Sequence, residues 1–408
     1  MVKRPRLLFV STRFLFPVDS GGKIRTTQIL RGMKEDADYE IVLVSPATPE
    51  ELSLYANELP SVCDEFLSWP QKERGRLFNV TRMRHLVSSI PIPVRTDFDT
   101  AGAALISKEI ERADVVVFDF LHAAVLTPSR ITKPSVLFTH NVEAEIFERH
   151  VKAASNPAFR WIWNNQYQKM LAYERDQLSR FDVVVAVSER DADKFRDDYG
   201  THHLHCIPTG VDLDFFAYQA PSRANAVVFC GSMDWMANQD GVEFFLDSVW
   251  PIIHEKRPEA TFTVVGRNPP NKLLEKAKRF GPRVTFTGFV DDVRDHIAAA
   301  RVNVIPLRVG GGTRLKVYEA MAIGTPIVST QIGVEGLPVK DGVHYRCADD
   351  AHSFADATIE LLDNEACAVK IAEQARKTVE EQFSYRNAAK EFARACEISS
   401  RRFNSSCA

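Results

Sequence analysis

The sequence predicts an α/β protein built from two doubly wound parallel sheets. Three observations favour this class. Short apolar runs rich in β-branched residues recur along the chain, as buried parallel strands require. Longer amphipathic runs separate them, which is typical of βαβ units. The series restarts after a turn-rich stretch at 208–224, so a second half of the same kind is expected.

The first half is expected to form one Rossmann-like domain over residues 1–215. Its strands are predicted at 6–11, 40–45, 114–118, 135–139 and 182–188. Amphipathic helices are predicted in the intervals, at 24–34, 101–112, 157–180 and 190–199. Because helices alternate with apolar strands, the strands should pair in parallel and be covered on both faces.

A second Rossmann-like domain is expected over residues 216–385. Its strands are predicted at 225–232, 261–267, 283–289, 302–307 and 325–330. Helices are predicted at 240–255, 271–280, 292–300, 314–323, 352–363 and 366–382. The remaining segment, 386–408, is expected to be a C-terminal helix that ends in a disordered tail, "RRFNSSCA".

Composition excludes several classes of function. A length of 408 residues suggests two or three domains, and a net charge of −3 argues against bulk nucleic-acid binding. The seven cysteines form no C-x-x-C pair, which argues for free thiols in a reducing compartment and against a disulfide frame or zinc site. The apolar run 7–10 is too short for a signal peptide, and no run of about 18 apolar residues occurs. We expect a cytoplasmic protein.

The segment 71–95 departs from this acidic average. It contains six Lys or Arg residues and one Glu, interleaved with apolar side chains. One interpretation is an exposed basic helix and loop. The other is a surface that contacts anionic lipid at the inner face of the cell membrane, or an anionic acceptor.

Glycines and cations follow most of the predicted strands. In open parallel sheets, ligands bind beyond the carboxyl ends of the strands. Two such edges facing each other would form a cleft lined with backbone amides and cations, which suits a nucleotide diphosphate. The residues at these ends are Gly21, Gly22 and Lys23, then His140, Gly231, Ser232, Arg267 and Phe289, and finally the loop 308–313.

The loop 308–313 gives the sharpest signal. Gly311 and Gly312 lie in a run of three glycines that allows close approach of a ligand to the backbone. Thr313 is a candidate N-cap for the helix that follows. Arg314 and Lys316 then place two cations where a helix normally prefers acids, which is unfavourable unless an anion binds.

Glu319 lies one turn further along, beside the face that packs on the core. A carboxylate half removed from water needs hydrogen-bond donors, and the adjacent hydroxyls of a ribose supply two. The alternative is pairing with Lys316 or with neighbouring backbone. His140 is less specific, because a lone histidine at a strand end is as often a packed residue. No Walker loop, dinucleotide fingerprint or metal-ligand spacing occurs.

Eight segments, taken in order, resemble the GT-B glycosyltransferases of family 4, also called glycosyl transferases group 1. They cover most of the chain. The segments are "SGGKIRT", "THN", "VAVSERDADKF", "IPTGVD", "FCGSMDW", "VVGR", "FTGFVDDV" and "GGGTRLKVYEAMAIGTPIVST". The resemblance implies a GT-B fold and transfer of a hexose-type unit from a nucleotide diphosphate sugar, as co-substrate, to a hydroxyl acceptor. It also implies retention at the anomeric carbon and no required metal.

The resemblance also implies roles for residues. Glu319 would bind the ribose, and Arg314 and Lys316 would bind the diphosphate and act as electrophilic catalysts. Gly21 and Gly22 would lie near the diphosphate and the sugar. The remaining implied roles are His140 at the reacting centre and Arg267 and Phe289 at the base, and Gly231 and Ser232 are expected on the donor. Because the sequence departs from the family pattern, Lys23 or Arg25 is expected to add to the diphosphate site, and the backbone of 311–313 is expected to recognise the sugar.

Two departures from the family pattern matter. The family usually has a pair of Glu residues eight positions apart, and here the first position is Gly311. The family often has an Arg and a Lys after the first strand of the second half, and here the sequence reads "GSMDWMANQDG". Two alternatives to a sugar transferase therefore stand: a sugar-nucleotide epimerase or hydrolase, and an inactive nucleotide-sugar-binding scaffold. The expected acceptor is a hydroxyl, with a lipid-linked saccharide for a bacterial surface polysaccharide as one option.

Overall fold

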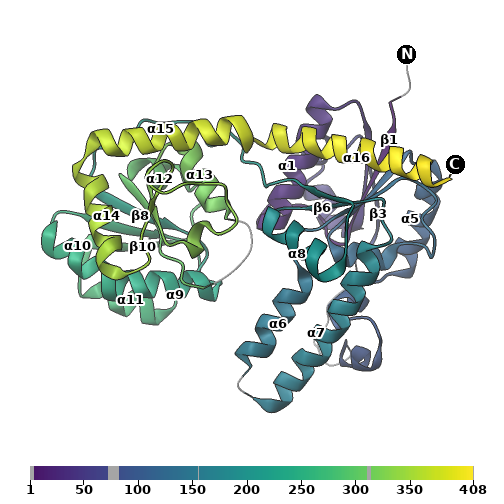
Figure 1. Ribbon diagram of the computed structural model, residues 1–408, viewed down its shortest axis with the longest axis horizontal. Helices are drawn as coiled ribbons and strands as arrows, with labels where there is room; N and C mark the ends of the chain where they lie inside the picture. The colour runs from purple at the N-terminus through teal and green to yellow at the C-terminus, as the bar shows by residue number, and fades with distance from the viewer. Residues whose placement is uncertain (1–3, 72–81, 155, 310–313, 408) are drawn as a thin grey trace. The chain divides into compact units, whose positions relative to one another are not determined.

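The computed structural model describes residues 4–71, 82–154, 156–309 and 314–407, which form two units (Figure 1). The first unit comprises Met1–Thr209 and Arg386–Ala408, and the second comprises Gly210–Tyr385. Each unit is a parallel sheet between helical layers, so the predicted α/β class is confirmed. No helix in these ranges is long and apolar enough to span a membrane.

The first sheet has the strand order β3-β2-β1-β4-β5-β6-β7, and every described pair is parallel. The order reverses between β1 and β4, and in open α/β sheets ligands bind beyond the carboxyl ends of the strands at such a point. The strands are β1 (Arg6–Ser11), β2 (Glu40–Ala47), β3 (Glu65–Pro70), β4 (Val115–Asp119), β5 (Ser135–Phe138), β6 (Val183–Ala186) and β7 (Leu204–Cys206).

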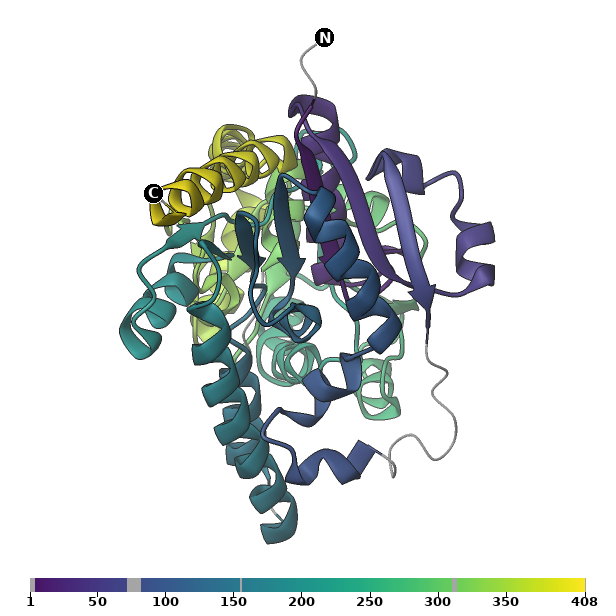
Figure 2. The same ribbon diagram turned by 90° about the vertical axis from the view of Figure 1, so that its right-hand side faces the viewer.

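Helices cover both faces of the first sheet. Among them, α6 and α7 form a long antiparallel hairpin that projects away from the sheet (Figures 1 and 2). The helices of this unit are α1 (Gly21–Asp36), α2 (Pro49–Leu54), α4 (Ile92–Asp97), α5 (Thr100–Arg112), α6 (Glu143–Ala153), α7 (Pro157–Leu178), α8 (Glu189–Tyr199) and α16 (Tyr385–Cys407), with 3₁₀ turns η1 (Leu59–Ser61), η2 (Arg82–Val87) and η3 (Leu121–Leu126).

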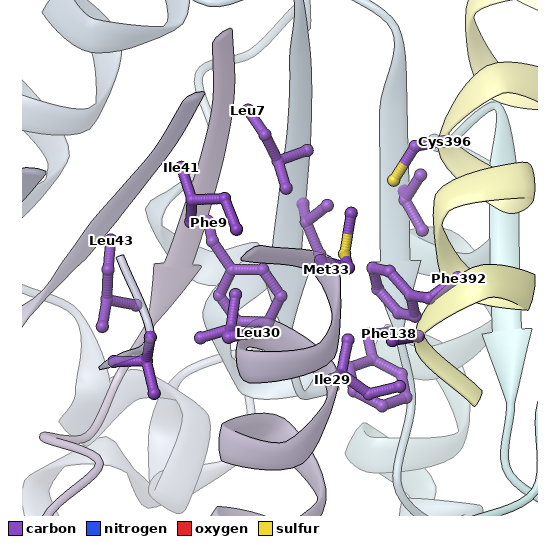
Figure 3. Close-up of a cluster of buried hydrophobic side chains, with 14 of the residues drawn as sticks. Leu7, Phe9, Ile29, Leu30, Met33, Ile41, Leu43, Phe138, Phe392 and Cys396 are labelled. Carbon is purple, nitrogen blue, oxygen red and sulfur yellow. The ribbon is translucent and has the colours of Figure 1, made fainter. Parts of the chain in front are cut away.

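The C-terminal helix α16 belongs to the core of the first unit. Phe392 lies 4.9 Å from Phe138, measured between ring centres, and packs with Met33 of α1 in the cluster of Figure 3. The sequence placed 386–408 apart from both domains and expected a disordered tail. The structure differs, because α16 continues to Cys407. One face of the helix over 388–399 is buried, and tertiary packing of such a face is the main source of helix stability.

The second sheet repeats the doubly wound pattern with the order β10-β9-β8-β11-β12-β13. The order reverses between β8 and β11. The strands are β8 (Ala226–Cys230), β9 (Thr261–Val265), β10 (Val284–Gly288), β11 (Val302–Ile305), β12 (Ile327–Ser329) and β13 (Arg346–Cys347). The helices are α9 (Met236–Phe244), α10 (Trp250–Lys256), α11 (Asn271–Lys278), α12 (Arg294–Ala299), α13 (Leu315–Ile323), α14 (Ala351–Asp363) and α15 (Glu365–Gln382), with η4 (Phe245–Val249), η5 (Gly281–Arg283) and η6 (Ile332–Val334).

Candidate active site

The start of α13 carries the two cations predicted from the sequence. Arg314 occupies the N-cap position, and the first turn contains no acidic residue. The predicted N-cap, Thr313, and its neighbours Gly311 and Gly312 lie outside the described residues. Arg314 is buried, and its Nη2 lies 3.8 Å from Glu335 Oε2 on the surface.

Lys316 points back over the end of β8. Its Nζ donates a hydrogen bond of 2.9 Å to Asn238 Oδ1 and lies 4.5 Å from the centre of the Phe229 ring. Burial lowers the pKa of this ammonium to about 8. In the described part of the chain, no carboxylate lies within ion-pair distance of it. A desolvated cation with one neutral acceptor favours the binding of an anion.

Gly231 makes room for this lysine. A Cβ at this position would lie 2.8 Å from Lys316 Nζ and 2.9 Å from Asn238 Nδ2. Asn238 also donates 2.7 Å to the carbonyl of Ser232, so it ties the residues after β8 to Lys316. Sequence reasoning missed Asn238, although it lies in the "GSMDWMANQDG" segment that departs from the family pattern.

Glu319 lies one turn beyond Lys316 on α13 and is half-buried. Burial raises the pKa of its carboxyl to about 7, and the charge of Lys316 opposes this shift. Among the residues that the structure describes, none forms a hydrogen bond with this carboxylate. Lys316 and Glu319 thus lie together at the edge of the second sheet, both in unfavourable environments for a charge.

Arg267 and Ser232 both hydrogen-bond to the carboxylate of Asp234, a residue that sequence reasoning did not select. Arg267 Nε lies 2.7 Å from Asp234 Oδ2, and Ser232 Oγ donates to the same oxygen at 2.9 Å. Asn268 donates to the other oxygen at 2.9 Å. Phe289 follows β10 and is 71% exposed. The predicted base-side residues therefore lie at the same sheet edge, with Arg267 already paired.

His140 lies two residues after β5, fully enclosed in the first unit. Its Nδ1 lies 2.7 Å from Arg25 Nη1, and its Nε2 lies 2.8 Å from Asp119 Oδ1. A guanidinium only donates, so Nδ1 must be the acceptor and Nε2–H must donate to Asp119. Burial lowers the pKa of the imidazole to about 4, so the ring is neutral at pH 7.

Asp119 and Arg25 complete this buried network. Asp119 also accepts from Thr26 Oγ1 at 3.1 Å and from Ser11 Oγ at 3.3 Å, at the point where the strand order reverses. Arg25 Nε donates 2.5 Å to Thr209 Oγ1. Burial lowers the pKa of Arg25 to about 10. The sequence suggested Arg25 as a further cation for the diphosphate, whereas the structure encloses it with His140 and Thr209. Sequence reasoning assigned no role to Asp119 or Thr209, because each looks ordinary in its own segment.

The glycine pair opens α1 beside the histidine. Phe120 stacks on His140 with ring centres 3.7 Å apart and an angle of 4° between the planes. A Cβ on Gly22 would lie 2.4 Å from the tip of the Phe120 ring, so a larger residue does not fit without movement. Gly21 begins the helix. Lys23 donates 3.1 Å to the carbonyl of Pro17, which directs it to the loop before α1 and not to His140.

Two family models match the chain, one on each half. The model described as "Glycosyltransferase Family 4" matches residues 20–215. The model described as "Glycosyl transferases group 1" matches residues 224–364. Together they cover every strand of the two sheets except β1, and they include His140, Arg25, Asp119 and the start of α13.

Relatives and solved structures agree with these models. An uncharacterized 44.6 kDa protein in the cps region of Klebsiella pneumoniae is 25% identical over 276 residues, which is 65% of this chain and 69% of that protein. A phosphatidyl-myo-inositol mannosyltransferase of Mycobacterium leprae is 30% identical over 169 residues, 39% of this chain and 44% of that protein. The chain thus matches less than half of that mannosyltransferase.

The fold is shared with a crystal structure of HepE from Anabaena in complex with UDP and glucose. The two chains are 15% identical with a TM-score of 0.66, and the match covers 96% of this chain and 99% of HepE. At this identity the likeness concerns the fold alone. With a family model on each half and this architecture, the chain belongs to the GT-B glycosyltransferases of the family 4 type.

Proposed function

We propose that this protein transfers a hexose-type sugar from a nucleotide diphosphate sugar to a hydroxyl acceptor, with retention at the anomeric carbon. The observation that carries the proposal is the pair of half-buried charged groups on α13, Lys316 and Glu319. A diphosphate would supply the negative charge that the Lys316 ammonium lacks, and the ribose hydroxyls would donate hydrogen bonds to the Glu319 carboxylate. The UDP in the HepE crystal structure supports a nucleotide as the shared part of the donor.

Lys316 and Arg314 stabilise the leaving diphosphate. As the bond from the anomeric carbon to the phosphate oxygen breaks, negative charge grows on that oxygen. Cations fixed in advance at this point stabilise the transition state more than the ground state. Lys316 is suited to this work, because its pKa of about 8 leaves it charged at pH 7 in a poorly solvated position.

The reaction needs no acid–base residue from the chain. The acceptor oxygen forms its bond to the anomeric carbon on the face that the diphosphate leaves. The acceptor proton passes to an oxygen of the departing phosphate, which balances the step. His140 is neutral, and both of its ring nitrogens are engaged, so its proposed role is to hold Asp119, Phe120 and Arg25 in place at the edge of the first sheet.

The donor sugar is inferred from a relative, and the acceptor is inferred from the composition of one segment. The mannosyltransferase of Mycobacterium leprae favours mannose as the first sugar to test. With Gly311 in place of the family's first Glu, backbone amides of 311–313 are proposed to recognise the sugar hydroxyls. The basic segment 71–95 favours a membrane-linked saccharide as acceptor, which suits a cytoplasmic enzyme of polysaccharide biosynthesis that contacts the membrane peripherally.

A donor panel tests the proposal. Nucleotide diphosphate sugars with different bases and sugars are titrated by calorimetry, with and without a chelator. Each binder is then incubated with lipid extracts, and the products are analysed by mass spectrometry and NMR. We expect binding without added metal and an α-linked product from an α-linked donor. Turnover without any acceptor favours the epimerase or hydrolase, and binding without conversion favours the inactive scaffold.

A further inference from the structure

A second polar cluster lies beyond the carboxyl edge of the first sheet, and the proposed reaction does not use it. It consists of Asp97 at the end of α4, His122 in η3 and Glu143 at the start of α6, and is called the His122 cluster below. His122 Nδ1 lies 2.8 Å from Asp97 Oδ2, and His122 Nε2 lies 3.9 Å from Glu143 Oε2. Three elements that are separate in the chain therefore bring one imidazole between two carboxylates.

The strand order explains where this cluster lies. His122 follows β4, and Glu143 follows β5, so both come after the carboxyl ends of neighbouring strands. β4 also lies beside β1, where the strand order reverses and where open α/β sheets bind their ligands. Phe120, between β4 and His122, stacks on His140. The cluster thus continues from the buried Asp119 network toward the ligand-binding edge.

The three side chains are shielded from water but not sealed. Their exposed fractions are 16% for Asp97, 15% for His122 and 12% for Glu143. Because an ionised carboxylate only accepts, His122 Nδ1–H donates to Asp97. In the described part of the chain, neither Nε2 of His122 nor the carboxylate of Glu143 has a hydrogen-bond partner. Partly desolvated polar atoms of this kind favour a ligand that supplies both donors and acceptors.

The charges around His122 select a neutral ligand. Burial opposes the charge of this imidazole, but the hydrogen bond to Asp97 and the charges of Glu143 and Asp97 raise its pKa above the ordinary value. Arg13, an exposed residue that follows β1, acts in the opposite direction. With His122 protonated, the two carboxylates are balanced by the imidazolium and by Arg13. This differs from the start of α13, where Lys316 and Arg314 favour an anion.

We propose that the His122 cluster binds hydroxyl groups of a saccharide, so that the acceptor of the proposed transfer presents a neutral sugar. Glu143 accepts a hydrogen bond from one sugar hydroxyl, and Nε2–H of His122 donates to the oxygen of a hydroxyl beside it. Asp97 orients the imidazole through Nδ1–H. A phosphate fits less well, because two carboxylates face it. The word acceptor rests on the proposed function, whereas binding of a glycoside is measured without any sugar donor.

Saturation-transfer NMR tests the binding. The full chain is mixed, without nucleotide, with the methyl α-glycosides of mannose, glucose and galactose at millimolar concentration. We expect at least one glycoside to receive saturation from the protein and inorganic phosphate at equal concentration not to displace it. Glu143→Gln should weaken the binding about tenfold, because a neutral amide replaces a charged acceptor. The matched control is Glu148→Gln on α6, whose carboxylate pairs with Lys152 at 2.7 Å.

Two further variants separate binding from a structural role. His122→Gln keeps an amide donor near the position of Nε2, so it should retain more glycoside affinity than His122→Ala. A cluster that only ties α4 to η3 and α6 would instead lower the melting temperature of both variants and leave glycoside affinity unchanged. Absence of saturation for every glycoside, equal saturation of wild type and Glu143→Gln, or displacement by phosphate would each overturn the proposal.

Transfer assays distinguish this inference from the proposed function. With a donor and acceptor that react, Glu143→Gln should raise the KM for the acceptor and leave donor affinity, measured by calorimetry, unchanged. An unchanged KM for the acceptor would count against the His122 cluster alone. Glycoside binding that the variants weaken, together with no conversion of any nucleotide sugar, would instead reject the transferase and retain the saccharide site.

Discussion

At the carboxyl edge of the first sheet, the buried carboxylate of Asp119 is surrounded by donors from His140, Thr26 and Ser11. At the same edge of the second sheet, Lys316 has one neutral amide as acceptor, and Glu319 has no hydrogen bond within the described ranges. The two units share one topology, yet the buried carboxylate of the first edge is supplied with donors, whereas Lys316 and Glu319 of the second edge have few partners. The difference indicates that the Asp119 network is complete by itself, while the second edge becomes complete with a ligand.

The largest effect is expected from removing the cation of the second edge. Lys316→Ala should lower kcat about 10²–10³-fold, because fixed charge at the leaving group acts mainly in the transition state. Lys316→Arg should retain more activity. The control is Lys272→Ala, an exposed lysine of α11 paired with Glu243. Steady-state kinetics and a thermal melt decide the matter, and unchanged kcat in a folded Lys316→Ala protein would exclude the assignment.

The first edge predicts an effect on stability instead of turnover. The folded-state pKa of His140, about 4, lies below its ordinary value near 6.5. The unfolded chain therefore takes up a proton first as pH falls, and stability present above pH 6.5 is lost toward pH 4. Between pH 7 and 5 this histidine should cost about 2 kcal/mol of unfolding free energy.

Urea unfolding of wild type and His140→Gln at both pH values measures this contribution. Subtracting the variant removes the contributions of carboxylates that titrate in the same window. His202→Gln is the control, because that side chain is exposed. Parallel pH profiles for wild type and His140→Gln would show that the buried histidine is not held neutral.

Donor binding at the second edge should depend on pH in both directions. Below about pH 7 Glu319 becomes protonated and loses the stronger, charge-assisted hydrogen bonds that its carboxylate accepts from ribose hydroxyls, and above about pH 8 Lys316 loses its charge. The affinity for the donor should therefore be highest between about pH 7 and pH 8. The falls on the acid and alkaline sides follow the titration of the interacting pair and not of either residue alone. Glu319→Gln should bind about tenfold more weakly and lack the acid limb.

A deoxyribose donor sharpens this result. Wild type should lose affinity for a donor that lacks a ribose hydroxyl, while Glu319→Gln should lose little more, because the two changes remove the same interaction. Calorimetry across pH 6 to 9 measures both effects. Independent, additive losses would place the ribose elsewhere.

The contrast between the two edges also explains what the sequence could predict. Lys316 could be selected from the sequence because the start of a helix normally prefers acidic residues, and this preference involves only a few neighbouring residues. The network of Asp119 depends on β1 lying beside β4 and on Thr209 reaching Arg25, 184 residues away in the chain. Nothing within either segment signals these contacts, because they follow from strand order.

Strands were predicted where burial on both faces demands unbroken apolar runs. β3, β7 and β13 were missed, since they lie toward the ends of their sheets and contain polar residues. The place of α16 was missed for the same reason as the Asp119 network. Its apolar stripe predicts a helix, but only the folded sheet determines which surface that stripe covers.

The smallest expected change in stability is that of Gly231→Ala, and Gly22→Ala at the first edge gives the contrast. Gly231→Ala places a Cβ against Lys316 Nζ and Asn238 Nδ2, the mobile ends of side chains. The variant should keep its stability within about 0.5 kcal/mol. Its donor affinity should fall, because the lysine must move. Gly22→Ala instead presses on the Phe120 ring, which is stacked on His140, and the Phe120 backbone has a positive φ of 67°. That ring has little room to yield, so stability should fall by about 1–3 kcal/mol.

Chemical unfolding measures the stability of both variants, and calorimetry measures their affinity for the donor. If Gly231→Ala proves the less stable of the two, the second edge is also a rigid structural element, and its poorly satisfied charges need an explanation other than a ligand.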